Sequence, residues 1–180
     1  MRRRTLLASA LAAVLPGVVR AAVTEGVEEA LRRETALAGA ESKALLVFFH
    51  ASWCSWCRVF DRLLADPPAA SVFNKHFRVF HVRAQEHTEA NRALELPGAE
   101  TLYSRYAPDG AGLPFYLVVD ARERPVVTSI SARTGENIGF PVAAPELDAF
   151  AAVLKTGAPA ITALELKIVR DACVRMMARR

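Results

Sequence analysis

The chain of 180 residues is 52% hydrophobic and 8% aromatic, a composition that excludes a disordered protein and fits one globular domain with a core of its own. Its formal net charge is +4, from 23 Lys and Arg residues against 19 Asp and Glu residues. Four of the basic residues and none of the acidic ones lie in residues 1–21, so the rest of the chain carries 19 charges of each sign. This even balance argues against nucleic acid or an anionic membrane surface as a partner.

Residues 1–21 have the pattern of a signal peptide. Three arginines at positions 2–4 precede an apolar run over residues 6–19, and Ala21 completes a small-residue cleavage site. The apolar run is shorter than the roughly 20 residues that a membrane-spanning helix needs, so we expect cleavage near Ala21 and no permanent membrane anchor. The paired arginines also fit a twin-arginine signal loosely, which leaves the export route open. We expect the protein in the periplasm or an equivalent exported space, where disulfides form and persist.

The first part of the remaining chain predicts a helix, a strand and a second helix. Residues 24–39 fit an amphipathic helix that Thr24 caps and Gly39 ends, with an expected buried face of Val27, Ala30, Leu31 and Leu37. Residues 44–49 are consecutively apolar, which is typical of a strand covered on both faces. A helical pattern then begins at Cys54 and stops at the two prolines that follow Asp66.

The second part of the chain predicts further alternation and then a hairpin. The expected elements are a helix over residues 69–75, a strand over 78–83, a helix over 99–106, hairpin strands over 115–119 and 125–130, and a helix over 146–155 opened by Pro145. A capping box of Thr162 and Glu165 begins the last helix, whose expected apolar face is Leu166, Val169, Cys173 and Met176. This order predicts an α/β three-layer sandwich with a mixed central sheet flanked by helices. We expect the main domain over residues 22–157 and a C-terminal helical extension over residues 158–180.

Cys54 and Cys57 are the residues with the clearest chemical meaning. Cys54 lies at the first turn of a predicted helix, where free N–H groups and the helix dipole favour a thiolate. Cys57 lies one turn further, close enough to form a disulfide with Cys54. We therefore expect Cys54 to be the exposed attacking thiol and Cys57 to be the buried resolving thiol.

Other uses of this cysteine pair are less favoured. The pair closes a very small loop, so it would stabilise the fold little as a purely structural disulfide. A zinc site needs two further ligands, and no second Cys-x-x-Cys or paired-His motif occurs. Covalent haem attachment would need His at the position of Arg58. We expect no metal and no bound cofactor.

The chain resembles the thioredoxin superfamily through three segments. They are Trp53-Cys-Ser-Trp-Cys57, Gly112-Leu-Pro-Phe115 and Asn137-Ile-Gly-Phe-Pro141, and the resemblance is greatest to exported thioredoxin-like proteins of the Trp-Cys-x-x-Cys type. It implies a thioredoxin-like fold, a cis peptide bond before Pro114, and pairing of the Leu113 backbone with the substrate chain. Trp53 and Trp56 flank the cysteines, and we expect both to be exposed as part of an apolar docking surface for polypeptides.

One position departs from thioredoxin proper, which has a buried aspartate six residues before the first cysteine. That position is Phe48 here, so the usual proton acceptor for Cys57 is missing. His81 or Glu86 are candidates to replace it, although a single histidine on a strand is more often structural. The third cysteine, Cys173, is expected to be a small buried residue of the core.

These observations predict a protein-disulfide oxidoreductase. Reduction of disulfides is the favoured direction, because Trp precedes the motif as it does in thioredoxins that pass electrons on. The expected partners are polypeptide thiols or disulfides and an upstream redox donor. Three alternatives stay open, namely an oxidase or isomerase that uses the same pair, a non-catalytic binding or assembly module, and a metal chaperone.

Overall fold

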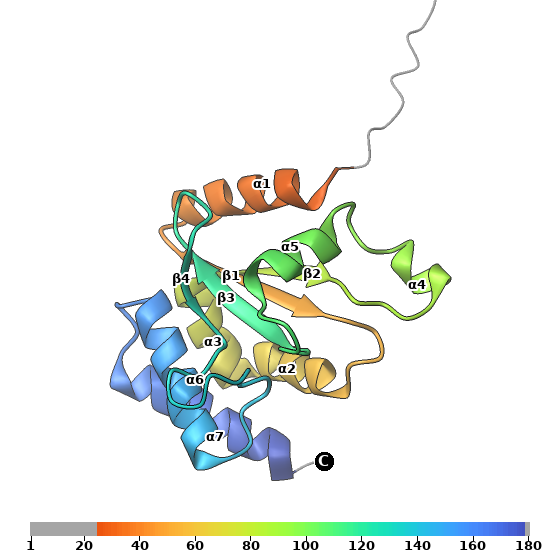
Figure 1. Ribbon diagram of the computed structural model, residues 1–180. Coiled ribbons are helices and arrows are strands. Elements are labelled where there is room, and N and C mark those ends of the chain that lie inside the picture. The colour runs from red at the N-terminus through yellow and green to blue at the C-terminus, as the bar shows by residue number, and fades with distance from the viewer. Residues whose placement is uncertain (1–24, 179–180) are drawn as a thin grey trace, which may run out of the picture.

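The structure is a computed structural model that describes residues 25–178 (Figure 1). Its elements are α1 (Val27–Ala40), β1 (Ala44–His50), α2 (Ser55–Ala65), α3 (Pro67–His76), β2 (Phe77–Arg83), α4 (Glu89–Arg92), α5 (Ala99–Tyr106), β3 (Phe115–Val119), β4 (Pro125–Thr128), α6 (Ala144–Gly157) and α7 (Ala163–Ala178). The expected signal peptide over residues 1–21 and the expected helix cap Thr24 lie outside the described residues. No helix within residues 25–178 is long and apolar enough to cross a membrane.

The four strands form one mixed sheet in the order β2-β1-β3-β4. Strand β1 runs parallel to β2 and antiparallel to β3, and β3 and β4 form the expected antiparallel hairpin. Strand β4 ends at Thr128, earlier than predicted, because Ile130 leaves the hairpin and pairs with Asn137 instead. The predicted mixed sheet is therefore confirmed.

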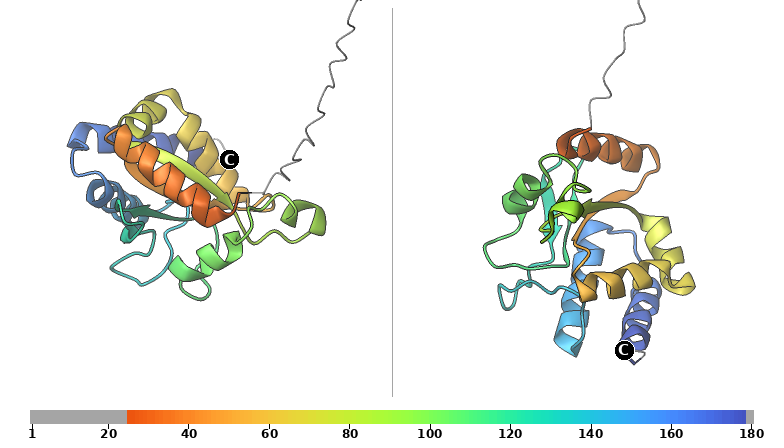
Figure 2. Two further views of the ribbon diagram at one scale, coloured as in Figure 1. Left: turned by 90° about the horizontal axis from the view of Figure 1, so that it is seen from above. Right: turned by 90° about the vertical axis from the view of Figure 1, so that its right-hand side faces the viewer.

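Helices cover both faces of the sheet, as Figure 2 shows, so the predicted three-layer sandwich is also confirmed. Strand β1 is buried on both sides, with alternate residues in different cores. Leu46 and Phe48 face the core formed with α2, α3, α6 and α7. Leu45, Val47 and Phe49 face the core formed with α1 and α5. This double burial explains the unbroken apolar run in the sequence.

Helix α1 begins after Gly26 and differs from the prediction at one buried position. Leu37 is 39% exposed, whereas Ala38 is buried. Ala38 lies two turns after Leu31 and therefore on the same helix face, while Leu37 is rotated by about 100° from it. The expectation that Leu37 is buried was wrong because that face continues through position 38.

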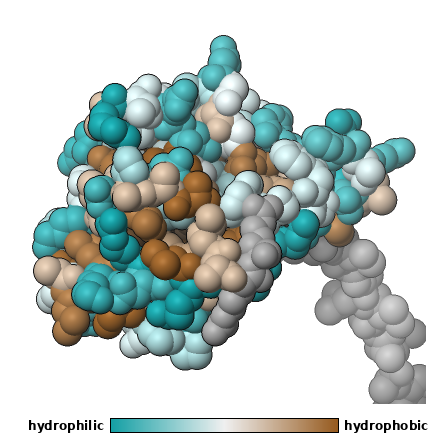
Figure 3. Space-filling view, turned by 90° about the horizontal axis from the view of Figure 1, so that it is seen from below, coloured by the Kyte–Doolittle hydropathy of each residue, from teal (hydrophilic) through white to brown (hydrophobic). Residues whose placement is uncertain are grey.

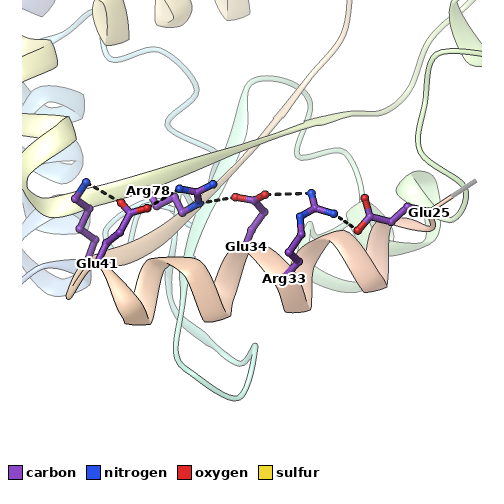
Figure 4. A network of polar contacts seen from close by, with 6 residues as sticks. Glu25, Arg33, Glu34, Glu41 and Arg78 are labelled. Atoms are coloured by element: carbon purple, nitrogen blue, oxygen red, sulfur yellow. Dashed lines mark hydrogen bonds and ion pairs between the residues drawn. The ribbon is translucent and has the colours of Figure 1, made fainter.

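Charged side chains link α1 to the edge strand β2 (Figure 4). Arg78 of β2 donates hydrogen bonds to Glu34 and Glu41, and Arg33 pairs with Glu25 and Glu34. Most of these groups are partly exposed, and such pairs contribute little individually. The apolar face of α1 therefore contributes most of its attachment to the sheet.

Helix α7 begins with the expected capping box. The Thr162 hydroxyl accepts a hydrogen bond from the Glu165 N–H at 3.2 Å, and the Glu165 carboxylate accepts one from the Thr162 N–H at 2.8 Å. Val169, Cys173 and Met176 are buried in the same core as α2, α3 and α6. The helix thus contributes to the main core, while the proposed boundary at residue 158 stays a prediction.

Candidate functional site

Three loops meet at one edge of the sheet. Because β1 and β2 are parallel, the segments that leave them, residues 51–57 and 84–88, begin at the same edge. Strand β3 runs in the opposite direction, so residues 112–114, which precede it, lie at that edge as well. The topology therefore brings the cysteines and the predicted substrate-binding proline together.

Cys54 and Cys57 are joined in a disulfide at the start of α2, with their Cα atoms 5.3 Å apart. Cys54 is the N-cap of the helix in an extended conformation, and its Sγ accepts the N–H of Cys57 at 3.0 Å. This position gives Cys54 a hydrogen-bond donor and the positive end of the helix dipole, both of which favour its thiolate when the disulfide is open.

The two cysteines do not show the expected contrast in exposure. Cys54 is 3% exposed and Cys57 is 1% exposed, so both are buried in the disulfide form. In this state the Cys54 sulfur is bonded to that of the buried Cys57 and also accepts the Cys57 N–H. The expectation of an exposed Cys54 was therefore wrong for this redox state.

The peptide bond between Leu113 and Pro114 is cis, as the resemblance implied. Pro114 is buried and Leu113 is half-buried. The carbonyl of Gly112 accepts a hydrogen bond from the Tyr103 hydroxyl at 3.2 Å. Within the described residues, no hydrogen bond involves the backbone N–H or C=O of Leu113. These groups are therefore available to a polypeptide that approaches the cysteines.

The two tryptophans differ in their surroundings. Trp53 is 43% exposed, donates a hydrogen bond from Nε1 to the Gln85 carbonyl at 2.7 Å, and stacks on His87 with ring centroids 4.5 Å apart. Trp56 is half-buried rather than exposed as expected. It stacks on Phe140 at 5.8 Å, and this partner comes from a distant part of the sequence.

Glu86 anchors the loop that carries the cysteines. It is 2% exposed, and its two oxygens accept hydrogen bonds from the Ser52 N–H at 2.8 Å and the Ser52 hydroxyl at 2.6 Å. Burial raises the pKa of Glu86, but the bonds from Ser52 and the charge of Arg83 outweigh it, so the pKa lies below its usual value. The carboxylate is thus ionised at neutral pH, and it makes no hydrogen bond with Cys57 within the described residues.

His81 lies beside Phe48, the residue at the position of the missing aspartate. The two are partners across β1 and β2, with ring centroids 5.2 Å apart. The Nδ1 atom of His81 lies 3.7 Å from Oδ1 of Asp61, and the His81 ring packs edge-on against His50. Burial lowers the pKa of both histidines, which favours their neutral forms. His50 was not singled out from the sequence, although it lies on the same strand face as Phe48.

The surface beside Trp53 is hollowed. A depression of about 580 Å³ is lined by Trp53, Gln85, Glu86, His87, Arg92, Glu95 and Glu100. A separate groove of about 530 Å³ lies between β4 and α6, and its lining is more apolar than that of the depression beside Trp53. This groove includes neither cysteine. Within residues 25–178, no group of three or more His, Cys, Asp or Glu side chains is arranged to hold a metal ion.

A mixed sheet with a disulfide at the N-terminus of α2 and a cis proline before β3 is a thioredoxin-like fold of the disulfide-oxidoreductase type. A family model described as thioredoxin-like matches residues 24–121, more than half of the chain. The chain therefore belongs to the thioredoxin-like family.

Two solved structures resemble this chain at low sequence identity. A disulphide isomerase from Xylella fastidiosa Temecula1 is 18% identical, with a TM-score of 0.46, over 92% of this chain and 99% of that one. A DsbH oxidoreductase is 21% identical, with a TM-score of 0.43, over 82% of this chain and 94% of that one. No curated protein matches the chain significantly.

Proposed function

We propose that the protein is a thiol–disulfide oxidoreductase that reduces disulfide bonds of polypeptides in the periplasm or an equivalent exported space. The observation that best supports this function is the Cys54–Cys57 pair at the first turn of α2, at the same sheet edge as cis-Pro114. The proposed location depends on the signal peptide pattern of residues 1–21. The proposed direction depends on Trp53, which precedes the motif as in electron-passing thioredoxins.

The reaction proceeds by two thiol–disulfide exchanges. The Cys54 thiolate attacks one sulfur of a substrate disulfide, which breaks the substrate S–S bond, releases one substrate thiolate and forms a mixed disulfide. Cys57 loses its proton and attacks the Cys54 sulfur, which releases the second substrate thiolate and closes the Cys54–Cys57 disulfide. Two electrons thus pass to the substrate, whose two thiolates take up protons. A dithiol donor must reduce the pair again, and no bound cofactor is needed.

The surface near the cysteines fits a polypeptide with apolar side chains. Trp53 and the half-buried Trp56 flank the pair, and Leu113 offers free backbone groups for an extended chain. Figure 3 shows apolar side chains gathered on the side of the molecule where α2, α6 and α7 lie. Val142, two residues before α6, is 38% exposed. Exposed apolar groups of this kind favour protein partners.

A redox titration of the chain without residues 1–21 against glutathione buffers tests the proposal. The fraction of reduced Cys54 and Cys57 is measured by alkylation and mass spectrometry. A midpoint near about −270 mV supports a reductase, and one near about −120 mV makes the protein an oxidant. A pair below about −300 mV that also exchanges too slowly to equilibrate contradicts the enzyme function and leaves a binding module. As a control, Cys54→Ser must abolish turnover of a disulfide substrate while the fold is retained.

A further inference from the structure

Asn137 makes an unusually complete set of hydrogen bonds next to the cis proline. Its Nδ2 donates to the carbonyl of Ala111 at 2.9 Å and to the carbonyl of Pro114 at 2.9 Å. Its Oδ1 accepts from the Ser129 hydroxyl at 2.7 Å and from the Gly139 N–H at 3.3 Å. The side chain therefore joins the segment on both sides of Leu113 to the loop that follows β4.

The neighbouring groups determine which end of the carboxamide faces which partner. The Ser129 hydroxyl accepts a hydrogen bond from the Tyr116 N–H at 3.1 Å, so its own proton is available to Asn137. Both groups that approach Oδ1 are thus donors, and the groups that approach Nδ2 are all carbonyls, since Gly112 adds a third at 3.4 Å. Only the carboxamide of Asn, in this orientation, satisfies all of these partners.

The loop of Asn137 also reaches the cysteine motif. Three residues later, Phe140 stacks on Trp56, whose ring planes differ by only 10°. Between Asn137 and Phe140, Gly139 has a φ of 59° and lies close to Pro114. A Cβ atom added to Gly139 would lie 3.9 Å from the Cδ atom of Pro114. The loop thus contacts both the cis proline and the residue between the two cysteines.

We propose that Asn137 is a positioning residue, whose carboxamide holds residues 111–114 so that the free N–H and C=O of Leu113 face an extended polypeptide substrate. This inference rests on the proposed function, because it concerns substrate binding at the same site. The carbonyls held by Nδ2 belong to Ala111, Gly112 and Pro114, so they bracket the unpaired backbone of Leu113. An Asp or Ala at position 137 has no donor for them, which frees this segment to move.

Two reactions of the reduced protein separate positioning from chemistry. Reduction of insulin, with dithiothreitol as the reductant, requires a polypeptide to bind along Leu113. Alkylation of Cys54 by iodoacetamide requires only the thiolate. For both Asn137→Asp and Asn137→Ala, we expect kcat/KM for insulin to fall about tenfold, equal to about 1.4 kcal/mol, through a higher KM. The alkylation rate should stay within about twofold of the wild type.

The matched control is Asn74→Asp, the same change at an exposed residue of α3. It should leave both rates unchanged. If the wild type is active and both Asn137 variants have the same KM for insulin as the wild type, the inference is overturned. A parallel loss of the insulin and alkylation rates would also overturn it, since that pattern indicates general damage to the site. A wild type that does not reduce insulin would instead contradict the proposed function.

Discussion

Glu86 is expected to stabilise the loop before the cysteines through its negative charge. The side chain is buried and accepts two hydrogen bonds from Ser52, at 2.8 and 2.6 Å. Hydrogen bonds to a charged group contribute about 1.5–3 kcal/mol each, and a Gln at this position keeps one acceptor without the charge. We expect Glu86→Gln to lower the free energy of unfolding at pH 7 by about 2 kcal/mol.

The same substitution makes a prediction about pH. The pKa of Glu86 in the folded protein lies below its usual value, so the folded state binds a proton there less readily than the unfolded chain does. Its contribution is therefore fully present above the unfolded pKa of about 4.3 and is lost as the pH falls through the folded pKa. The difference in stability between wild type and Glu86→Gln should stay constant from about pH 7 to about pH 5 and shrink as the pH falls below about 4.3.

Urea unfolding of the oxidised proteins, followed by circular dichroism, measures this difference at each pH. The matched control is Glu89→Gln, because Glu89 is exposed and no described group pairs with its side chain. It should change the unfolding free energy by less than about 0.5 kcal/mol. Equal stability of wild type and Glu86→Gln at pH 7, or a difference that persists undiminished at low pH, would refute the assigned role of the carboxylate.

Further predictions concern packing and thiol reactivity. Gly157→Ala should lower the free energy of unfolding by about 1–3 kcal/mol, because the new Cβ would lie 2.5 Å from Cγ2 of the buried Val118. Gly39→Ala, which meets open space in α1, should instead raise it by about 0.5–1 kcal/mol, and thermal unfolding compares the two. Burial raises the pKa of Cys173 to about 12, so in the oxidised protein it should resist iodoacetamide at about pH 8 and react only in urea, as mass spectrometry would show. Phe60→Ala should cost about 3–5 kcal/mol in urea unfolding, since the ring is fully buried, and a smaller loss would show that the core refills the cavity.

Elements with strong local signals were predicted well. The helix Ala99–Tyr106 has the expected bounds, and the apolar run of β1 marked a strand buried on both faces. The error in α1 concerned which helix face is buried. Leu37 has the right hydrophobicity for the core but faces solvent, because the neighbouring Ala38 lies on the helix face that packs on the sheet.

The candidate site divides in the same way. The positions of Cys54 and Cys57 at a helix start follow from adjacent sequence, and the cis bond at Pro114 followed from the family resemblance. The burial of Trp56 did not follow, because its stacking partner Phe140 is brought near only by the fold. The importance of Asn137 was likewise hidden, since a motif alone does not show which carbonyls its side chain reaches.

By itself, the sequence determined the order of the strands and of every helix except α4, and the cysteine pair at the start of α2, because these depend on periodicity and spacing over short stretches. The family followed from the resemblance of its motifs. Only the tertiary structure decided that Glu86 holds Ser52 and that Asn137 holds the residues around Leu113. Hydrogen bonds act over about 3 Å and require aligned groups, so they depend on how three separate loops meet at one sheet edge. That geometry arises only when the whole sheet has formed.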